Sequence, residues 1–191
     1  IGSCGACRLC LVELELTGGR RKLVTSCNYP VRKDCTVHVS SPAAVAARKG
    51  IMELLLARSP DSPELRDIAG KMGIAGTPYP TVTESQRNCI LCGLCAKVCE
   101  EVMECSAIGF SGRGVNRIIA TPFKLASDQC IVCGACAAVC PVGTIQIRMH
   151  PESGEAEISP FKSRAKLQVC SGCGTLMAAE PLGKKTIDLV H

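Results

Sequence analysis

The 191-residue sequence has very few aromatic side chains, with no Trp, two Tyr and three Phe. Aromatic residues supply much of the apolar area of an ordinary core, so this chain cannot build a large one in the usual way. The same sequence contains 16 cysteines. We therefore expect metal centres to act as internal staples in place of part of the core, and the metal-free chain to fold poorly.

Several other features are missing, and each absence argues against a class of function. No apolar run reaches the length of a membrane span, and no signal peptide is visible. There is no Gly-rich dinucleotide fingerprint, no P-loop and no nucleophile–base arrangement. The net charge of +5 comes from dispersed basic side chains without interleaved aromatics, so nucleic-acid binding is disfavoured.

The cysteines that are present follow a repeated pattern. Between residues 89 and 140 the spacing C-x2-C-x2-C-x3-C occurs twice, which is typical of a ferredoxin with two [4Fe–4S] clusters. Three cysteines of each run hold one cubane, and the fourth lies on the following helix and reaches the other cubane. The first cluster is assigned Cys89, Cys92, Cys95 and Cys140, and the second Cys130, Cys133, Cys136 and Cys99.

Two alternatives for these cysteines are weaker. Zinc sites use paired Cys-x2-Cys knuckles, and a third cysteine two residues further on does not fit that layout. Disulfide scaffolds belong to secreted proteins, whereas these cysteines cluster in metal-binding loops.

A second metal signal precedes the double motif. Cys7, Cys10 and Cys27 fit the last three ligands of a plant-type [2Fe–2S] ferredoxin. Cys4 is closer to Cys7 than the usual first ligand, so either Cys4 substitutes for that ligand or the ligand lies upstream of Ile1. We favour the upstream position, because the sequence starts inside a motif. Cys35 follows too closely to be a ligand and is expected to be a buried free thiol.

The remaining cysteines have less clear roles. Cys105 is interpreted as a spare thiol packed near a cluster. Cys170 and Cys173 form a Cys-x2-Cys pair with Gly172 inside it and Gly174 after it, a candidate for an additional [4Fe–4S] or zinc site. Two thiolates cannot complete either site, so further ligands would come from Cys105, Cys35, His150, residues beyond His191 or a partner.

The hydrophobic pattern predicts an α+β protein. Short strands are expected at residues 8–16, 23–26, 36–39, 144–149 and 156–159. Pro42 opens a helix over residues 42–58, with Val45, Ile51 and Leu54–Leu56 on its apolar face, and a second helix covers 64–72. We therefore expect the chain to divide into four parts. They are a partial [2Fe–2S] ferredoxin β-grasp domain (1–40), a helical linker (41–80), a bacterial-type 2[4Fe–4S] ferredoxin domain (81–160) and a tail with the Cys-x2-Cys pair (161–191).

The segments GACRLCLVEL and KLVTSCNYPV, followed by the double cubane motif, resemble a known family. The resemblance covers roughly residues 2–150. It is to the large iron–sulfur subunit of respiratory complex I, the diaphorase iron–sulfur subunit of NAD-reducing hydrogenases, and NAD-linked formate dehydrogenases. It implies an electron wire within a hetero-oligomer, from a flavin-bearing NAD(H)-linked subunit or a ferredoxin module to a catalytic metal-containing subunit or a quinone site.

The sequence departs from this family in one place. The family usually has a His-x3-Cys-x2-Cys-x5-Cys cluster between the two ferredoxin domains, but residues 41–88 contain neither Cys nor His. We therefore expect that cluster to be absent from the linker.

Three functions follow from these patterns. The favoured one is a non-catalytic electron-transfer subunit of an oxidoreductase complex. The alternatives are a fragment of a catalytic hydrogenase or formate dehydrogenase chain, and a metal-stapled structural module. Reduced thiols and oxygen-sensitive clusters predict the cytoplasm, or the cytoplasmic face of a membrane complex.

Overall fold

The computed structural model describes residues 5–82 and 88–188. The chain forms two compact units, Gly2–Cys92 and Gly93–His191. Each is described here by itself.

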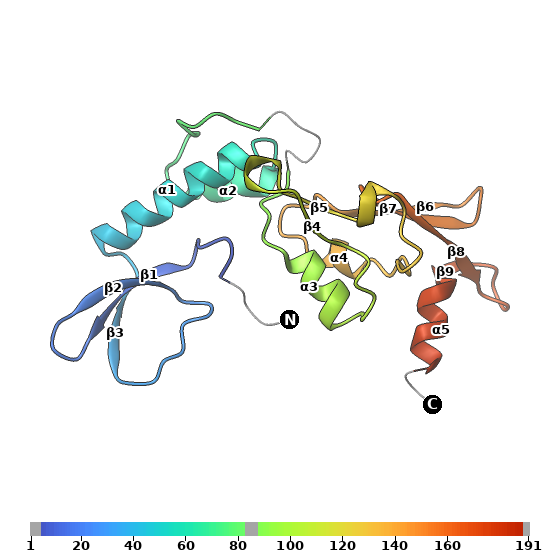
Figure 1. Ribbon diagram of the computed structural model, residues 1–191, viewed down its shortest axis with the longest axis horizontal. Helices are drawn as coiled ribbons and strands as arrows, with labels where there is room; N and C mark the ends of the chain where they lie inside the picture. The colour runs from blue at the N-terminus through green and yellow to red at the C-terminus, as the bar shows by residue number, and fades with distance from the viewer. Residues whose placement is uncertain (1–4, 83–87, 189–191) are drawn as a thin grey trace. The chain divides into compact units, whose positions relative to one another are not determined.

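The first unit begins with a three-stranded antiparallel sheet in the order β2-β1-β3 (Figure 1). The strands are β1 (Leu11–Leu16), β2 (Arg21–Thr25) and β3 (Cys35–His38), close to the predicted ranges. Leu11, Val12 and Leu14 of the central strand are buried. The strand prediction for this part of the chain is therefore confirmed.

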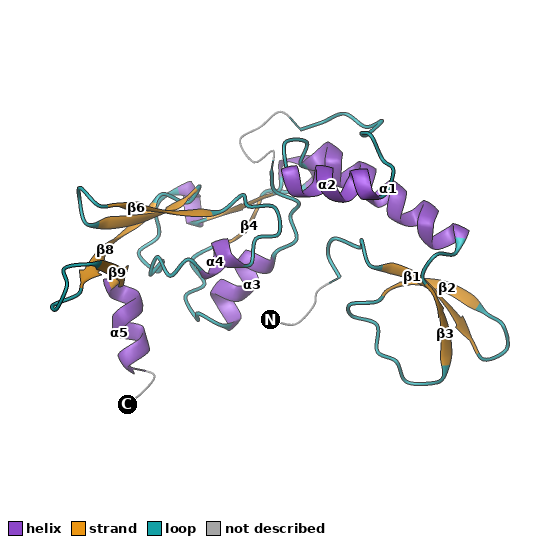
Figure 2. Cartoon of the chain, turned by 180° about the vertical axis from the view of Figure 1, so that it is seen from behind, coloured by secondary structure: helices purple, strands orange, loops and turns teal. Residues whose placement is uncertain are grey.

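Two helices follow the sheet, and Figure 2 shows them side by side. Helix α1 (Pro42–Arg58) and helix α2 (Pro63–Lys71) agree with the prediction to within a residue at each end. Each has Pro in its first turn and a serine cap, which fixes the start of the helix. The Ser41 hydroxyl accepts a hydrogen bond from the Ala44 N–H at 3.2 Å, and that of Ser62 accepts one from the Leu65 N–H at 3.3 Å.

The predicted apolar face of α1 is partly wrong. Val45 and Leu54 are 48% and 54% exposed, whereas Met52 and Leu56 are buried together with Ala44. Residues 44, 52 and 56 are separated by multiples of four, so they share one face of the helix. The buried face of the helix is therefore set by position, and it includes the small side chain of Ala44 as well as the larger Met52 and Leu56.

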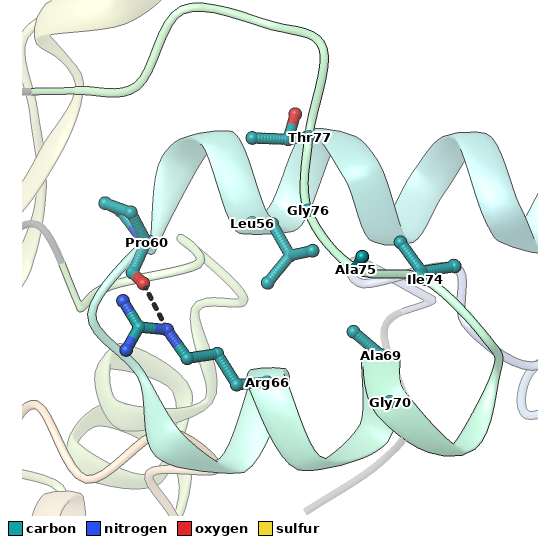
Figure 3. Close-up of a pocket in the computed structure, with 9 residues that line it drawn as sticks. All are labelled: Leu56, Pro60, Arg66, Ala69, Gly70, Ile74, Ala75, Gly76 and Thr77. Carbon is teal, nitrogen blue, oxygen red and sulfur yellow. Dashed lines mark hydrogen bonds between the residues drawn. The ribbon is translucent and has the colours of Figure 1, made fainter.

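An open pocket lies between α1, α2 and the segment after α2 (Figure 3). Leu56 lines it from α1 and Ala69 from α2, opposite residues 74–77. At one end the Arg66 Nε donates a hydrogen bond of 2.9 Å to the Pro60 carbonyl. Its lining side chains include no thiol, imidazole or carboxylate.

The cysteine repeat starts with Cys89 and Cys92 at the end of the first unit, and the rest of it lies in the second unit. Helix α3 (Leu94–Glu101) and the short helix α4 (Ala135–Ala138) pack against each other. Between them lie β4 (Gly109–Ser111), the 3-10 helix η1 (Gly114–Asn116), β5 (Ile118–Ala120) and the 3-10 helix η2 (Pro122–Lys124). Strands β4 and β5 form an antiparallel pair. The repeat thus has the expected order of cysteine loop, helical turn and strand.

The unit ends with a four-stranded antiparallel sheet in the order β6-β7-β8-β9. Its strands are β6 (Gln146–His150), β7 (Glu155–Ser159), β8 (Ser163–Val169) and β9 (Leu176–Ala179), and α5 (Glu180–Asp188) packs on β8 and β9. The predicted hairpin of β6 and β7 is confirmed, whereas β8, β9 and α5 were not predicted. In the described part of the chain, no helix is long and apolar enough to cross a membrane.

Candidate iron–sulfur centres

The two cubane loops have the same backbone conformation. The residue before the second cysteine is left-handed in both, with φ of +55° at Leu91 and +52° at Val132. The glycine after that cysteine is also left-handed, with φ of +77° at Gly93 and +75° at Gly134. A left-handed φ is uncommon for residues other than glycine, yet Leu91 and Val132 both have one. The internal repeat is therefore a repeat of local structure as well as of sequence.

The proposed second cluster corresponds to a cavity in the second unit. All four of its assigned ligands line this cavity: Cys99 from α3, Cys130 and Cys133 from the loop before α4, and Cys136 from α4. The rest of the lining is largely apolar and includes Met103, Ile108, Ile131 and Phe161. One ligand thus comes from the first half of the repeat and three from the second, as crossed ligation requires.

The crowding of these thiols affects their protonation. The pKa of Cys136 is raised to about 12, mainly by burial and in addition by the negative charges of Cys133, Cys130 and Cys99. Burial likewise raises the pKa of Cys133. Four thiolates this close repel one another unless cations lie between them, and bound iron would reverse the effect. The chemistry of this donor set therefore fits an iron–sulfur cluster.

Backbone amides point at several of the sulfurs. The Ala107 N–H donates to the Cys99 Sγ at 3.3 Å, and the Leu91 N–H donates to the Cys89 Sγ at 3.4 Å. The Ala135 N–H lowers the pKa of Cys133 by the same kind of bond, although burial outweighs it. Such bonds stabilise negative charge on the thiolates and help to set a cluster's reduction potential.

The ligands assigned to the first cluster fall on both sides of the division between the units. Cys89 and Cys92 belong to the first unit, and Cys95 and Cys140 to the second. Cys95 is buried on α3, and the other three are half-buried. Their assignment to one cluster remains a prediction from the repeat.

The amino-terminal cysteines lie on two adjacent loops. The Ser26 N–H donates to the Cys10 carbonyl at 3.1 Å. Burial raises the pKa of Cys10, but hydrogen bonds from Cys27 and Ser26 outweigh it, so the pKa is lowered overall. A Cβ on Gly5 would lie 2.7 Å from the Asn28 side-chain nitrogen, and Gly5 has a left-handed φ of +61°, a conformation that favours glycine. The structure thus brings Cys10 and Cys27 together.

The other residues of this region have different outcomes. Cys4 lies outside the described residues. Cys35, at the start of β3, is half-buried, so the prediction of a buried thiol is wrong. Cys35 lies at the sheet edge and pairs only with β1, which leaves its other side open. All described cysteines are free thiols.

The Cys-x2-Cys pair forms a tight loop between β8 and β9. The Cys170 N–H donates to the Thr175 carbonyl and the Gly174 N–H to the Cys170 carbonyl, both at 2.9 Å. The hydrogen bond with the Thr175 hydroxyl lowers the pKa of Cys173, and Cys170 contributes in the same direction. Cys173 is exposed. A metal site at this pair remains a prediction.

Cys105 is the thiol that the sequence analysis interprets as a spare one packed near a cluster. It lines the cavity of the second cluster with the four assigned ligands. Burial raises the pKa of Cys105, Lys185 lowers it, and Cys99 raises it again.

No three His, Cys, Asp or Glu side chains among the described residues are grouped to hold one metal ion. A cubane differs from such a site because each of its thiolates binds a separate iron.

Gly134 tests whether the loop conformation matters for metal binding. A Cβ there would meet only ordinary contact, 3.5 Å from the Ile147 Cδ1. The Gly134→Ala variant should therefore lose stability through its left-handed φ alone, by about 1–2 kcal/mol. Because the loop carries three ligands, we expect this variant to release iron to a chelator faster than the wild type.

Gly154→Ala is the matched control, since Gly154 is also left-handed, with φ of +65° and no atom near its would-be Cβ. It lies in the turn between β6 and β7, so it should lower stability without faster iron release. Equal release rates in the two variants would show that the loop conformation does not govern metal retention.

Comparison with known proteins agrees with this geometry. Residues 88–144 match the family model of the 4Fe-4S dicluster domain. The chain is 32% identical over 142 residues to the NADP-reducing hydrogenase subunit HndD of Solidesulfovibrio fructosivorans, a match covering 63% of this chain and 24% of the relative. It is 34% identical over 139 residues to the NADPH-Fe(3+) oxidoreductase subunit alpha of Geobacter sulfurreducens, covering 61% and 16%.

A longer alignment is found with the 78 kDa subunit of mitochondrial NADH-ubiquinone oxidoreductase of Neurospora crassa. It is 26% identical over 210 residues and covers 97% of this chain and 27% of the relative. The resemblance to complex I and hydrogenase iron–sulfur subunits is therefore confirmed. In these three matches the chain spans between 16% and 27% of the relative.

A solved structure supports the fold. The chain resembles one in the crystal structure of NAD+-reducing [NiFe]-hydrogenase in the H2-reduced state, with a TM-score of 0.60 and 24% identity. The match covers 74% of this chain and 69% of that one. The likeness concerns the fold alone, a mixed arrangement of helices and sheets.

Proposed function

We propose that this chain is an electron-transfer iron–sulfur unit of a larger redox complex. One observation carries the proposal: Cys99 and the three cysteines of the second motif line one largely apolar cavity. Two [4Fe–4S] clusters and one [2Fe–2S] cluster are the proposed cofactors. When bound, such clusters accept and release single electrons.

The role of the protein is to hold and tune these clusters. The cysteine thiolates bind iron, with the ligand sets given by the motifs. Amides such as the Ala107 N–H stabilise negative charge on the sulfurs. Apolar side chains around the second cavity, including Ile108 and Phe161, limit the access of water. Thiolate binding, hydrogen bonding and burial are the means by which a protein sets cluster potentials.

The first unit is proposed to carry the [2Fe–2S] cluster in a partial β-grasp domain. The proximity of Cys10 and Cys27 and the sheet formed by β1, β2 and β3 support this assignment. Cys7 is the third proposed ligand. The fourth proposed ligand is either Cys4 itself or a residue upstream of Ile1.

The proposed partners are a flavin-bearing NAD(H)-linked subunit and a subunit with a catalytic metal centre. Relatives described as subunits of NADH- and NADP(H)-linked oxidoreductases support a hetero-oligomer of this kind. The cytoplasm, or the cytoplasmic face of a membrane complex, is the proposed location because clusters need a reducing compartment.

Metal analysis of the anaerobically purified chain tests this function. We expect about ten iron atoms and as many labile sulfides, about eight of each in the two cubanes and about two in the [2Fe–2S] cluster. We also expect a visible absorbance bleached by dithionite, and EPR signals from the reduced clusters. Zinc in place of iron would refute the proposal. Turnover of NADH, hydrogen or formate by this chain alone would favour the catalytic alternative, and clusters that cannot be reduced would favour a structural module.

A further inference from the structure

The cavity of the second cluster is lined by one more cysteine than a cubane needs. A [4Fe–4S] cluster takes four thiolates, one for each iron. The assigned ligands are Cys99, Cys130, Cys133 and Cys136, and the fifth cysteine in the lining is Cys105. Cys105 therefore has no iron of its own in the assignment, although it lies at the same cavity.

The backbone holds Cys105 next to Cys99. The Cys105 N–H donates to the Cys99 carbonyl at 2.8 Å. The residues on either side of it, Glu104 and Ser106, are left-handed with φ of +52° and +47°, so the chain turns back toward the end of α3. This conformation is uncommon for residues other than glycine. The position of Cys105 thus follows from a specific local backbone.

A second element fixes the same loop. Lys185 of α5 donates a hydrogen bond to the Met103 carbonyl and lies 3.7 Å from the Glu104 carboxylate. These contacts join the loop to a helix that is distant in sequence. The Cys105 Sγ itself donates to the Met103 carbonyl at 3.1 Å, a bond within its own loop. The thiol is therefore near the cavity and held by one weak hydrogen bond.

We propose, on the basis of the function above, that Cys105 is a reserve ligand of the second cluster. When Cys99 cannot bind, the Cys105 thiol gives up its bond to Met103 and transfers its proton to water. Its thiolate then forms the bond to the iron that Cys99 would have held. One S–H bond breaks and one Fe–S bond forms, with no change in oxidation state.

Single and double substitutions separate a reserve ligand from a thiol that only packs near the cluster. The Cys105→Ser variant should keep the iron content of the wild type. The Cys99→Ala variant should also keep it, with an altered EPR signal from the second cluster, because Cys105 replaces the lost ligand. The Cys99→Ala/Cys105→Ser variant should lose about four iron atoms per chain, the content of one cubane.

The Cys136→Ala variant is the matched control. Cys136 lies on α4, and no backbone hydrogen bond joins it to Cys105 among the described contacts. We therefore expect this variant to lose the second cluster even though Cys105 is present. If the second cluster is kept in Cys99→Ala but lost in Cys136→Ala, Cys105 replaces Cys99 specifically as a ligand.

A second readout follows the thiol directly. Mass spectrometry after anaerobic labelling with N-ethylmaleimide should show Cys105 modified in the wild type and protected in Cys99→Ala. A Cys99→Ala chain that loses the second cluster, either as a folded protein or by aggregation, overturns the proposal. So does a chain that keeps the cluster while Cys105 labels as in the wild type. Absence of iron from the wild type would instead refute the proposed function.

Discussion

Removing the iron with a chelator under anaerobic conditions is expected to unfold the cysteine repeat in the second unit. Hydrogen exchange measured by mass spectrometry should accelerate at least about a hundredfold in α3 and α4, equivalent to about 2.8 kcal/mol. Any acceleration in the sheet of β1, β2 and β3 should be smaller, because three paired strands and the buried Leu11, Val12 and Leu14 stabilise it in addition to the proposed [2Fe–2S] cluster.

This expectation rests on how little else holds the repeat together. Helix α4 has four residues, far fewer than an isolated helix needs for stability in water. Val132 is left-handed, which costs a non-glycine residue about 1–2 kcal/mol. The core around the cavity consists of a few apolar side chains, including Ala107, Ile108 and Phe161. Iron–thiolate bonds are the strongest interactions available to offset these costs.

The control for this measurement is the same chain after iron and sulfide have been restored. Recovery of protection in α3 and α4 would show that the metal, rather than damage during chelation, controls the fold. Equal exchange in the iron-loaded and chelated forms would mean that the repeat folds without clusters, and the staple interpretation would be wrong.

Replacement of Cys140 by alanine should remove the first cluster and leave the second intact. Cys140 follows α4 and belongs by sequence to the second motif, but crossed ligation assigns it to the first cluster. The Cys140→Ala variant should therefore lose about four iron atoms per chain.

Double variants show which cluster has been lost. Adding Cys92→Ala to Cys140→Ala should cause no further loss, because both residues would hold the same cluster. Adding Cys133→Ala instead should remove about eight iron atoms in total. If each motif held its own cluster, the opposite would be seen: adding Cys92→Ala would remove the second set of iron atoms, and adding Cys133→Ala would cause no further loss. Size-exclusion chromatography of each variant would check that iron loss does not reflect aggregation.

The strand and helix predictions succeeded where the pattern was strong. Helix α1 was predicted with the observed bounds, because Pro42 marks its start. The carboxy-terminal elements β8, β9 and α5 carry no comparable pattern. One inward position of β8 is Ser163, which is buried and accepts a hydrogen bond of 3.3 Å from the Ser127 N–H. A buried serine does not register as an apolar position, so the strand could not be recognised.

The candidate site was largely predictable, with one exception. Spacing along the chain assigned Cys99 to the second motif's cluster, and the cavity in the second unit agrees with that assignment. Cys105 was predicted to pack near a cluster, but spacing could not show which one, because no motif includes it. Its position depends on the left-handed residues Glu104 and Ser106 and on the contact from Lys185.

The sequence by itself determined the chemistry of this protein. Repeated cysteine spacing defines the cluster type, because covalent chain geometry limits which thiolates can reach one cubane. The tertiary structure decided what spacing left open: Cys105 lies with Cys99 at the second cavity, and Cys35 is half-buried. These outcomes depend on packing between segments distant in sequence, such as α5 against the loop after α3, which no local pattern encodes.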